Sequence, residues 1–117
     1  MRHHQKGRSF GRPANQRVAL MRSLMRSLII HERISTTEAK AKELRPEIEK
    51  LVSHARVDTV ASRRLVSARL GGDDEVVKKL FTAIAPRYTE RPGGYTRIIK
   101  RTATATDGRK TAYISFV

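Results

Sequence analysis

The chain has 117 residues, no cysteine and no tryptophan, and its 25 Lys and Arg outnumber its 11 Asp and Glu to leave a net charge of +14. This length suits one modest domain, and the missing cysteines exclude disulfides and thiolate metal sites while leaving the compartment undetermined. A compact body with so much positive charge favours a polyanion as its partner.

The first segment, residues 1–12, is basic and nearly free of apolar residues. It holds four Lys and Arg, two His and no acid, and Phe10 is its one aromatic residue. Such a segment cannot bury itself, so we predict a basic extended arm that becomes ordered against phosphate groups. An inert terminus or a tag remnant is the alternative, although two histidines are too few for a tag. The expected RNA contacts of the arm are Arg2, His3, His4, Lys6, Arg8 and Arg12.

A first helix is predicted to begin at Pro13 or Asn15, because proline suits a first turn and asparagine can cap. Its apolar residues recur at helical spacing, and its cations fall largely on another face, where the high net charge favours phosphate contact over a merely solvated surface. The apolar stripe is Val18, Met21, Leu24, Met25, Leu28 and Ile29, and the cations are Arg17, Arg22 and Arg26.

A turn or very short strand at residues 33–36 is expected to precede a second helix. Ser35-Thr36-Thr37-Glu38 has the pattern of a capping box. Pro46 lies inside the helical pattern, where its ring and missing N–H predict either a kink or a break near Arg45. Acids and lysines alternate at spacings that permit pairs along the helix. The expected core stripe is Ala41, Leu44, Ile48, Leu51, Val52 and Ala55.

Two further helices are predicted, separated by Gly71-Gly72, which can adopt positive φ at a helix end. The third helix is expected to run from a cap at Asp58 to Leu70, and Asp73 is expected to cap the fourth, which Pro86 ends. In the third helix Val57, Ala61, Leu65 and Ala68 are predicted to point inward, and Arg63, Arg64 and Arg69 outward. The apolar face of the fourth is Val76, Val77, Leu80, Phe81 and Ile84.

The C-terminal residues predict a hairpin with strands at 95–101 and 111–117 and a turn at Asp107-Gly108. By alternation, Tyr95, Arg97, Ile99 and Arg101 share one face of the first strand, and Ala112, Ile114 and Phe116 share one face of the second. Before the hairpin, Gly93-Gly94 either turns the chain or lets a foreign backbone approach closely, two readings that are compatible.

Catalytic and metal-binding patterns are missing from the sequence, so we expect a binding protein with no catalytic residues, no metal and no cofactor. No GxSxG, P-loop or GxGxxG motif occurs, and His31-Glu32 lacks the second histidine of a zinc-protease helix. A small nuclease remains an alternative, because composition alone does not exclude one.

A helix-turn-helix protein that recognises DNA sequence is disfavoured, since Asp73-Asp74-Glu75 would repel DNA at the recognition helix. A free nucleoid-type DNA binder also stays open.

No membrane partner and no small-molecule substrate are expected. The sequence has no apolar run near the ~20 residues of a membrane span, and no visible signal peptide. Met1-Arg2 lacks the glycine that myristoylation requires.

Together the elements predict an α+β protein: a single domain at residues 13–117, mainly helical with about four helices, and a small sheet made by a short strand and the C-terminal hairpin.

Short motifs along the whole chain resemble one family, that of the bacterial large-subunit ribosomal protein seventeen. They occur in the family order, and their specificity comes from their number, since any one alone is weak. They are MRH…GR at the start, His31-Glu32-Arg33-Ile34 leading into Thr36-Thr37, Lys40–Arg45, Arg63-Arg64-Leu65, Lys79-Leu80-Phe81, Pro86-Arg87-Tyr88, Gly93–Ile98 and Ala112-Tyr113-Ile114.

The resemblance implies a non-catalytic constituent of the cytoplasmic ribosome, on the solvent side of the large subunit near the exit of the nascent-peptide tunnel. It implies binding to large-subunit ribosomal RNA and contacts with neighbouring ribosomal proteins. It also implies a helical domain with a small mixed sheet, in which a strand at Ile34 pairs with the C-terminal hairpin. Pro46 departs from the family, whose helix usually continues there.

Phosphates are expected to position the protein, while the shape of the folded RNA specifies the site. Arginines near the glycine pair can bind phosphate oxygens through two parallel hydrogen bonds. Beyond the arm, the expected RNA contacts are Arg17, Arg22, Arg26, Arg33, Lys40, Lys42, Arg45, Arg63, Arg64, Arg87, Arg91, Gly93, Gly94, Tyr95, Arg97, Lys100 and Arg101.

Overall fold

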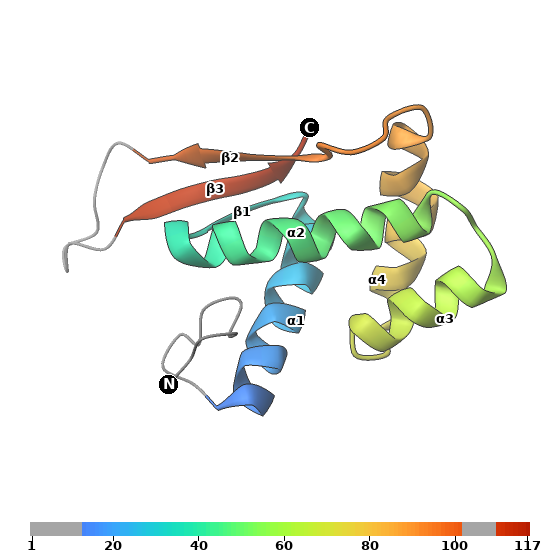
Figure 1. Cartoon of the computed structure of the whole chain (residues 1–117), viewed down its shortest axis with the longest axis horizontal. Helices are drawn as coiled ribbons and strands as arrows, with labels where there is room; N and C mark the ends of the chain where they lie inside the picture. Colours follow the sequence, from blue (N-terminus) through green and yellow to red (C-terminus); the bar gives the residue numbers. More distant parts are fainter. Residues whose placement is uncertain (1–12, 102–109) are drawn as a thin grey trace, which may run out of the picture.

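A computed structural model describes residues 13–101 and 110–117; the predictions for the arm and for the Asp107-Gly108 turn lie outside these residues. In the described part, four α-helices lie on one side of a three-stranded antiparallel sheet (Figure 1), which confirms the predicted α+β class. The elements are α1 (Ala14–His31), β1 (Arg33–Thr37), α2 (Glu38–Ala55), α3 (Val60–Arg69), α4 (Asp74–Lys79), the π-helix η1 (Leu80–Ile84), the 3-10 helix η2 (Ala85–Tyr88), β2 (Thr96–Lys100) and β3 (Thr111–Phe116).

The sheet has the order β1-β3-β2, so the C-terminal strand is its centre. The predicted hairpin is confirmed, because β2 and β3 are antiparallel neighbours with Ile98 opposite Ile114. The pairing implied for Ile34 is also confirmed: it lies opposite the same Ile114, in a strand of five residues. Ala112 and Ile114 are buried on the helix side, as their alternation predicts.

The core lies between the sheet and the helices, and α2 supplies more of its buried residues than any other single element. All six residues of the stripe predicted for α2 are buried. α2 runs through Pro46 as one continuous helix (Figure 1), so the predicted break does not occur. In α1 the stripe is buried only in its second half, at Met25, Leu28 and Ile29, while Val18 is exposed.

Two helix caps differ from the prediction, because the strand and the loop before each helix extend further than expected. Ser35 lies in β1 and pairs with Tyr113, so α2 begins later than predicted. Thr37 caps α2, because its hydroxyl accepts a hydrogen bond from the Lys40 N–H at 3.3 Å. Thr59, not Asp58, caps α3, and Asp58 instead forms an ion pair with Arg63.

The inward face predicted for α3 is wrong. Val66 and Leu70 are buried, whereas Val57 and Leu65 are exposed, as are Ala61 and Ala68. Since α3 carries small and apolar residues on every side, helical spacing does not select one face. Packing against α2 and α4 selects the face that carries Val66 and Leu70.

The glycine pair ends α3 as predicted, with Gly71 and Gly72 at φ of +77° and +83°. The Gly72 N–H donates to the Ser67 carbonyl at 2.8 Å, which gives the hydrogen bond of a Schellman motif.

Pro86 does not end the fourth helical run, which continues as the 3-10 helix η2 to Tyr88. Proline lacks an N–H and crowds the carbonyl four residues earlier. Just before the proline, the helix therefore changes to the wider π-helix η1. There the Ala85 N–H donates to the Leu80 carbonyl, five residues earlier.

Candidate nucleic-acid interface

Five of the cations expected to bind RNA form ion pairs with carboxylates in the folded chain. Lys42 and Lys100 share Glu38, with N–O distances of 2.9 and 3.5 Å. Their hydrogen bonds and charges, that of Lys42 first, lower the pKa of Glu38. Cations already paired with an acid add less to an external phosphate contact. The other three pairs are Arg45–Glu49, Arg63–Asp58 and Arg87–Glu32.

Arg22 and Arg26 of α1 lie against the end of α3 and are only partly exposed. Their guanidinium groups donate to the carbonyls of Ala68 and Leu70, at 3.5 and 3.3 Å. The last carbonyls of a helix have no partner within the helix and carry partial negative charge, which an arginine neutralises. These two cations therefore join α1 to α3, a role that helical spacing alone does not indicate.

Glu32 joins three elements at the end of α1. It has a left-handed φ of 63°, and its carboxylate pairs with Arg87 of η2 and with Lys79 of α4, the latter at 3.6 Å. The hydrogen bond from Arg87 is the main cause that lowers the pKa of Glu32. The pair serves the fold, because it fixes η2 relative to α1.

Replacing Glu32 with Gln is expected to lower the free energy of unfolding by about 1 kcal/mol at neutral pH, the upper range for a partly exposed pair. Because the folded pKa is lowered, this stabilisation is present above the ordinary glutamate pKa of 4.5 and is lost as pH falls through the folded pKa. Urea unfolding of wild type and variant across a pH series tests it. Glu90→Gln, at an exposed position, is the control; an equal difference at every pH would contradict the prediction.

A second group of expected RNA contacts has no ion-pair or hydrogen-bond partner for its side chain among residues 13–101 and 110–117. Most of these side chains are exposed, so their charge is available to an external anion. Sequence reasoning missed Arg69 and Lys78, which share this property and stand in the last turns of α3 and α4. The expected contacts in this group are Arg17, Arg33, Lys40, Arg64, Arg91 and Arg97.

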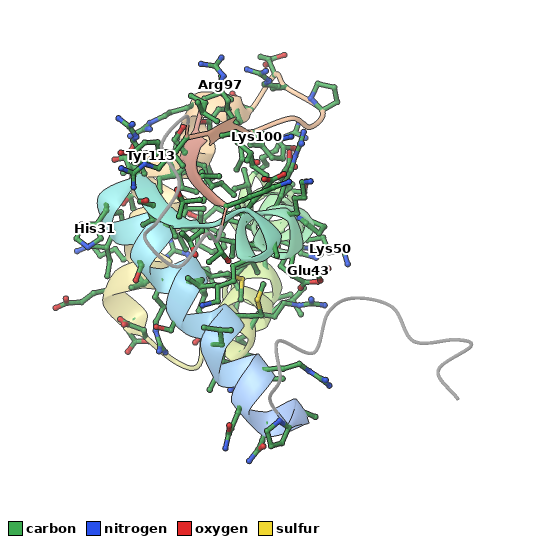
Figure 2. The ribbon with its side chains drawn as sticks, turned by 90° about the vertical axis from the view of Figure 1, so that its left-hand side faces the viewer. His31, Glu43, Lys50, Arg97, Lys100 and Tyr113 are labelled. Atoms are coloured by element: carbon green, nitrogen blue, oxygen red, sulfur yellow. The ribbon has the colours of Figure 1, made fainter. Side chains whose placement is uncertain are left out.

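The sheet face turned away from the helices holds three of the expected arginines. Arg33 of β1 and Arg97 of β2 lie on either side of Ser115, and Arg101 follows the end of β2. Figure 2 shows Arg97 and Tyr113 at this outer side of the molecule. Tyr113 was not among the expected contacts, although its alternation with the buried Ala112 and Ile114 is the signal that places it outside.

Tyr95 differs from its predicted position on the face of Arg97. Its side chain is 1% exposed, its ring centroid lies 5.2 Å from that of Tyr88, and its hydroxyl is bonded to Arg56 at 3.1 Å. The ring thus belongs to the core and offers no surface for stacking. Gly94 has a φ of +65°, so the turn reading of the glycine pair is confirmed.

The space around the glycine pair is also open. A Cβ at Gly93 would meet no atom within 4 Å, and one at Gly94 would meet only Arg91, at 3.9 Å. A foreign backbone has room to approach here.

The described residues show neither a helix with the length and hydropathy of a membrane span nor a cluster of three or more His, Cys, Asp or Glu placed to hold a metal ion. The surface of the part that the structure covers is instead distinguished by unpaired cations on several elements. Such a surface suits a polyanion that is contacted at many points.

Comparison with known proteins agrees with this surface. A family model described as ribosomal protein L17 matches residues 20–117. The chain is 52% identical over 117 residues to the large ribosomal subunit protein bL17 of Thermomicrobium roseum, an alignment that covers 100% of this chain and 99% of that protein. The chain therefore belongs to the ribosomal protein L17 family.

Proposed function

We propose that this protein is a structural constituent of the large ribosomal subunit that binds folded large-subunit ribosomal RNA through phosphate contacts and catalyses no reaction. The observation that carries the proposal is the set of cations without an ion-pair or hydrogen-bond partner among the described residues, in a member of a ribosomal protein family. They include the exposed Arg64, Arg91 and Arg97 and the partly exposed Arg17. Each cation that neutralises a phosphate releases counterions, which gives binding energy without base-specific contacts.

The proposed location is the solvent side of the large subunit, in the cytoplasm, near the exit of the nascent-peptide tunnel and beside other ribosomal proteins. Its support is the family membership. Residues 1–12 act, in this proposal, as a basic arm that reaches between RNA helices, attached to the domain at residues 13–117. An extended segment with four Lys and Arg can reach phosphates that a folded body cannot.

In cell extracts separated on a sucrose gradient, the protein is expected to migrate with the large subunit and to be released only by high salt. RNase is expected to move it to the top of the gradient, and DNase to leave it in place. Release by DNase would indicate a nucleoid protein instead. Turnover of labelled RNA by the purified protein would indicate a nuclease, and either result would overturn the proposal.

A further inference from the structure

The outer face of the sheet is defined by Arg33, Arg97, Ile99, Arg101 and Tyr113 with the small hydroxyl residues between them. The helices α1 to α4 lie on the opposite side of the sheet, so no described α-helix covers this face (Figure 1). The strand register sets its layout: one row is Arg33–Ser115–Arg97, and the next is Ser35–Tyr113–Ile99. Tyr113 therefore stands at the centre of the sheet, on its middle strand.

The guanidinium groups of two arginines lie over the ring of Tyr113 at cation–π distance. The guanidinium carbon of Arg33 lies 4.0 Å from the ring centroid, and that of Arg101 lies 5.3 Å from it. They come from opposite edges of the sheet and flank the row that contains Tyr113: Arg33 lies in the row of Ser115, and Arg101 lies beside Thr111, just after β2. Arg101 also donates to the Ser35 hydroxyl at 3.4 Å. The attraction between cation and ring limits the freedom of two long side chains. The face thus presents planar groups that are partly ordered before any partner arrives.

The charge of this face selects an anionic partner. It carries three arginines, and none of its described positions is acidic. Arg33 and Arg101 are exposed and have no carboxylate partner in the part of the chain that the structure describes, unlike Lys100 on the other side of β2, which pairs with Glu38. A guanidinium group is planar, and its flat face suits the flat surface of a base.

We propose that Arg33, Tyr113 and Arg101 form a stacking site for an unpaired base of RNA, with Arg97 beside it for the adjoining phosphate. The proposal rests on the proposed RNA-binding function and adds a contact of another kind, since a phosphate contact needs charge and a base stack needs flat groups. A duplex keeps its bases stacked on one another, so the site takes a single-stranded loop or bulge.

An acidic strand of a neighbouring protein is the competing occupant, and the observations favour RNA over it. Ile99, 49% exposed, is the one aliphatic side chain among the residues that define the face, and Val117, 42% exposed, follows the end of β3 on the same side. This is little apolar area for a protein partner. Both guanidinium groups lie at cation–π distance from an aromatic ring, an arrangement that an acidic side chain does not require.

The experiment uses the full chain and a short single-stranded RNA with one central 2-aminopurine, whose fluorescence falls on stacking; the protein has no tryptophan to add background. Tyr113→Leu removes the ring, and the double variant Arg33→Lys/Arg101→Lys keeps the charge but removes the planar groups. Arg45→Lys, on α2 away from the sheet face and paired with Glu49, is the matched control for an arginine-to-lysine change. Thermal unfolding by circular dichroism checks that each variant is folded.

Wild type and the Arg45→Lys control are expected to quench the single-stranded probe and to leave a duplex carrying the same base unquenched. Tyr113→Leu and the double variant are expected to lose the quenching and to bind the single strand at least about fivefold more weakly, the effect of one lost base stack. The salt dependence of binding should stay unchanged, because the charges remain.

Quenching that persists in both variants would overturn the stacking site while leaving RNA binding intact. Displacement of the probe by a short polyglutamate peptide at equal concentration would overturn it in favour of an acidic protein partner. If fluorescence anisotropy detects no binding of the wild-type protein to any RNA, both the stacking site and the proposed function fail.

Discussion

Replacing Tyr95 with Ala is expected to lower the free energy of unfolding by about 3–5 kcal/mol, a large share of the ~5–15 kcal/mol that holds a typical domain folded. The ring is fully buried and packs on Tyr88, so its removal leaves a cavity between the sheet and α2. The residue is also held by its backbone, since the Tyr95 N–H donates to Glu49 at 2.9 Å. Urea unfolding of the purified variant measures the loss.

Tyr95→Phe separates the core role of this residue from a role in RNA binding. It keeps the ring but removes the hydroxyl that bonds to Ser53 and Arg56, so we expect a cost of about 1 kcal/mol. The affinity for ribosomal RNA should stay unchanged, because the hydroxyl faces the protein interior. A stable Tyr95→Ala variant, or a Tyr95→Phe variant that loses RNA affinity with normal stability, would contradict the core assignment.

Tyr95 also shows where sequence reasoning stops. Alternation with Arg97 and Ile99 places its ring on the outer face, but alternation holds only within a strand, and β2 begins at Thr96. The left-handed backbone at Gly94, one residue earlier, redirects the chain and turns the ring into the core. Strands with regular spacing, such as β3, are predictable; the residue next to a glycine bend is not.

The cations show the same limit. The pairs Lys42–Glu38 and Arg45–Glu49 are four residues apart on one helix, a spacing that can be read from the sequence. The pairs of Glu32 with Arg87 and of Glu38 with Lys100 join residues more than fifty positions apart, so only the fold brings them together. The cations predicted from the sequence as RNA contacts therefore include some that form ion pairs within the fold and others that are available to RNA.

The division into paired and unpaired cations predicts that removing the same number of charges from each group lowers the affinity for RNA by different amounts. Converting four unpaired cations to Gln is expected to weaken binding to transcribed large-subunit ribosomal RNA roughly a hundredfold or more near 0.1 M salt. The slope of log K against log salt should fall in size by about three, since each lost phosphate contact removes about 0.7–0.9. Filter binding over a KCl series measures both. The four substitutions are Arg17→Gln, Arg64→Gln, Arg91→Gln and Arg97→Gln.

The matched control removes four cations that are paired with acids, and so changes the net charge by the same amount. Its loss of affinity and change of slope are expected to be much smaller, because each of these cations is already partly neutralised by a carboxylate in the free protein. Equal losses from the two sets would mean that RNA responds to the total charge alone, and would refute the interface built from unpaired cations. The control substitutions are Lys42→Gln, Arg45→Gln, Arg63→Gln and Lys100→Gln.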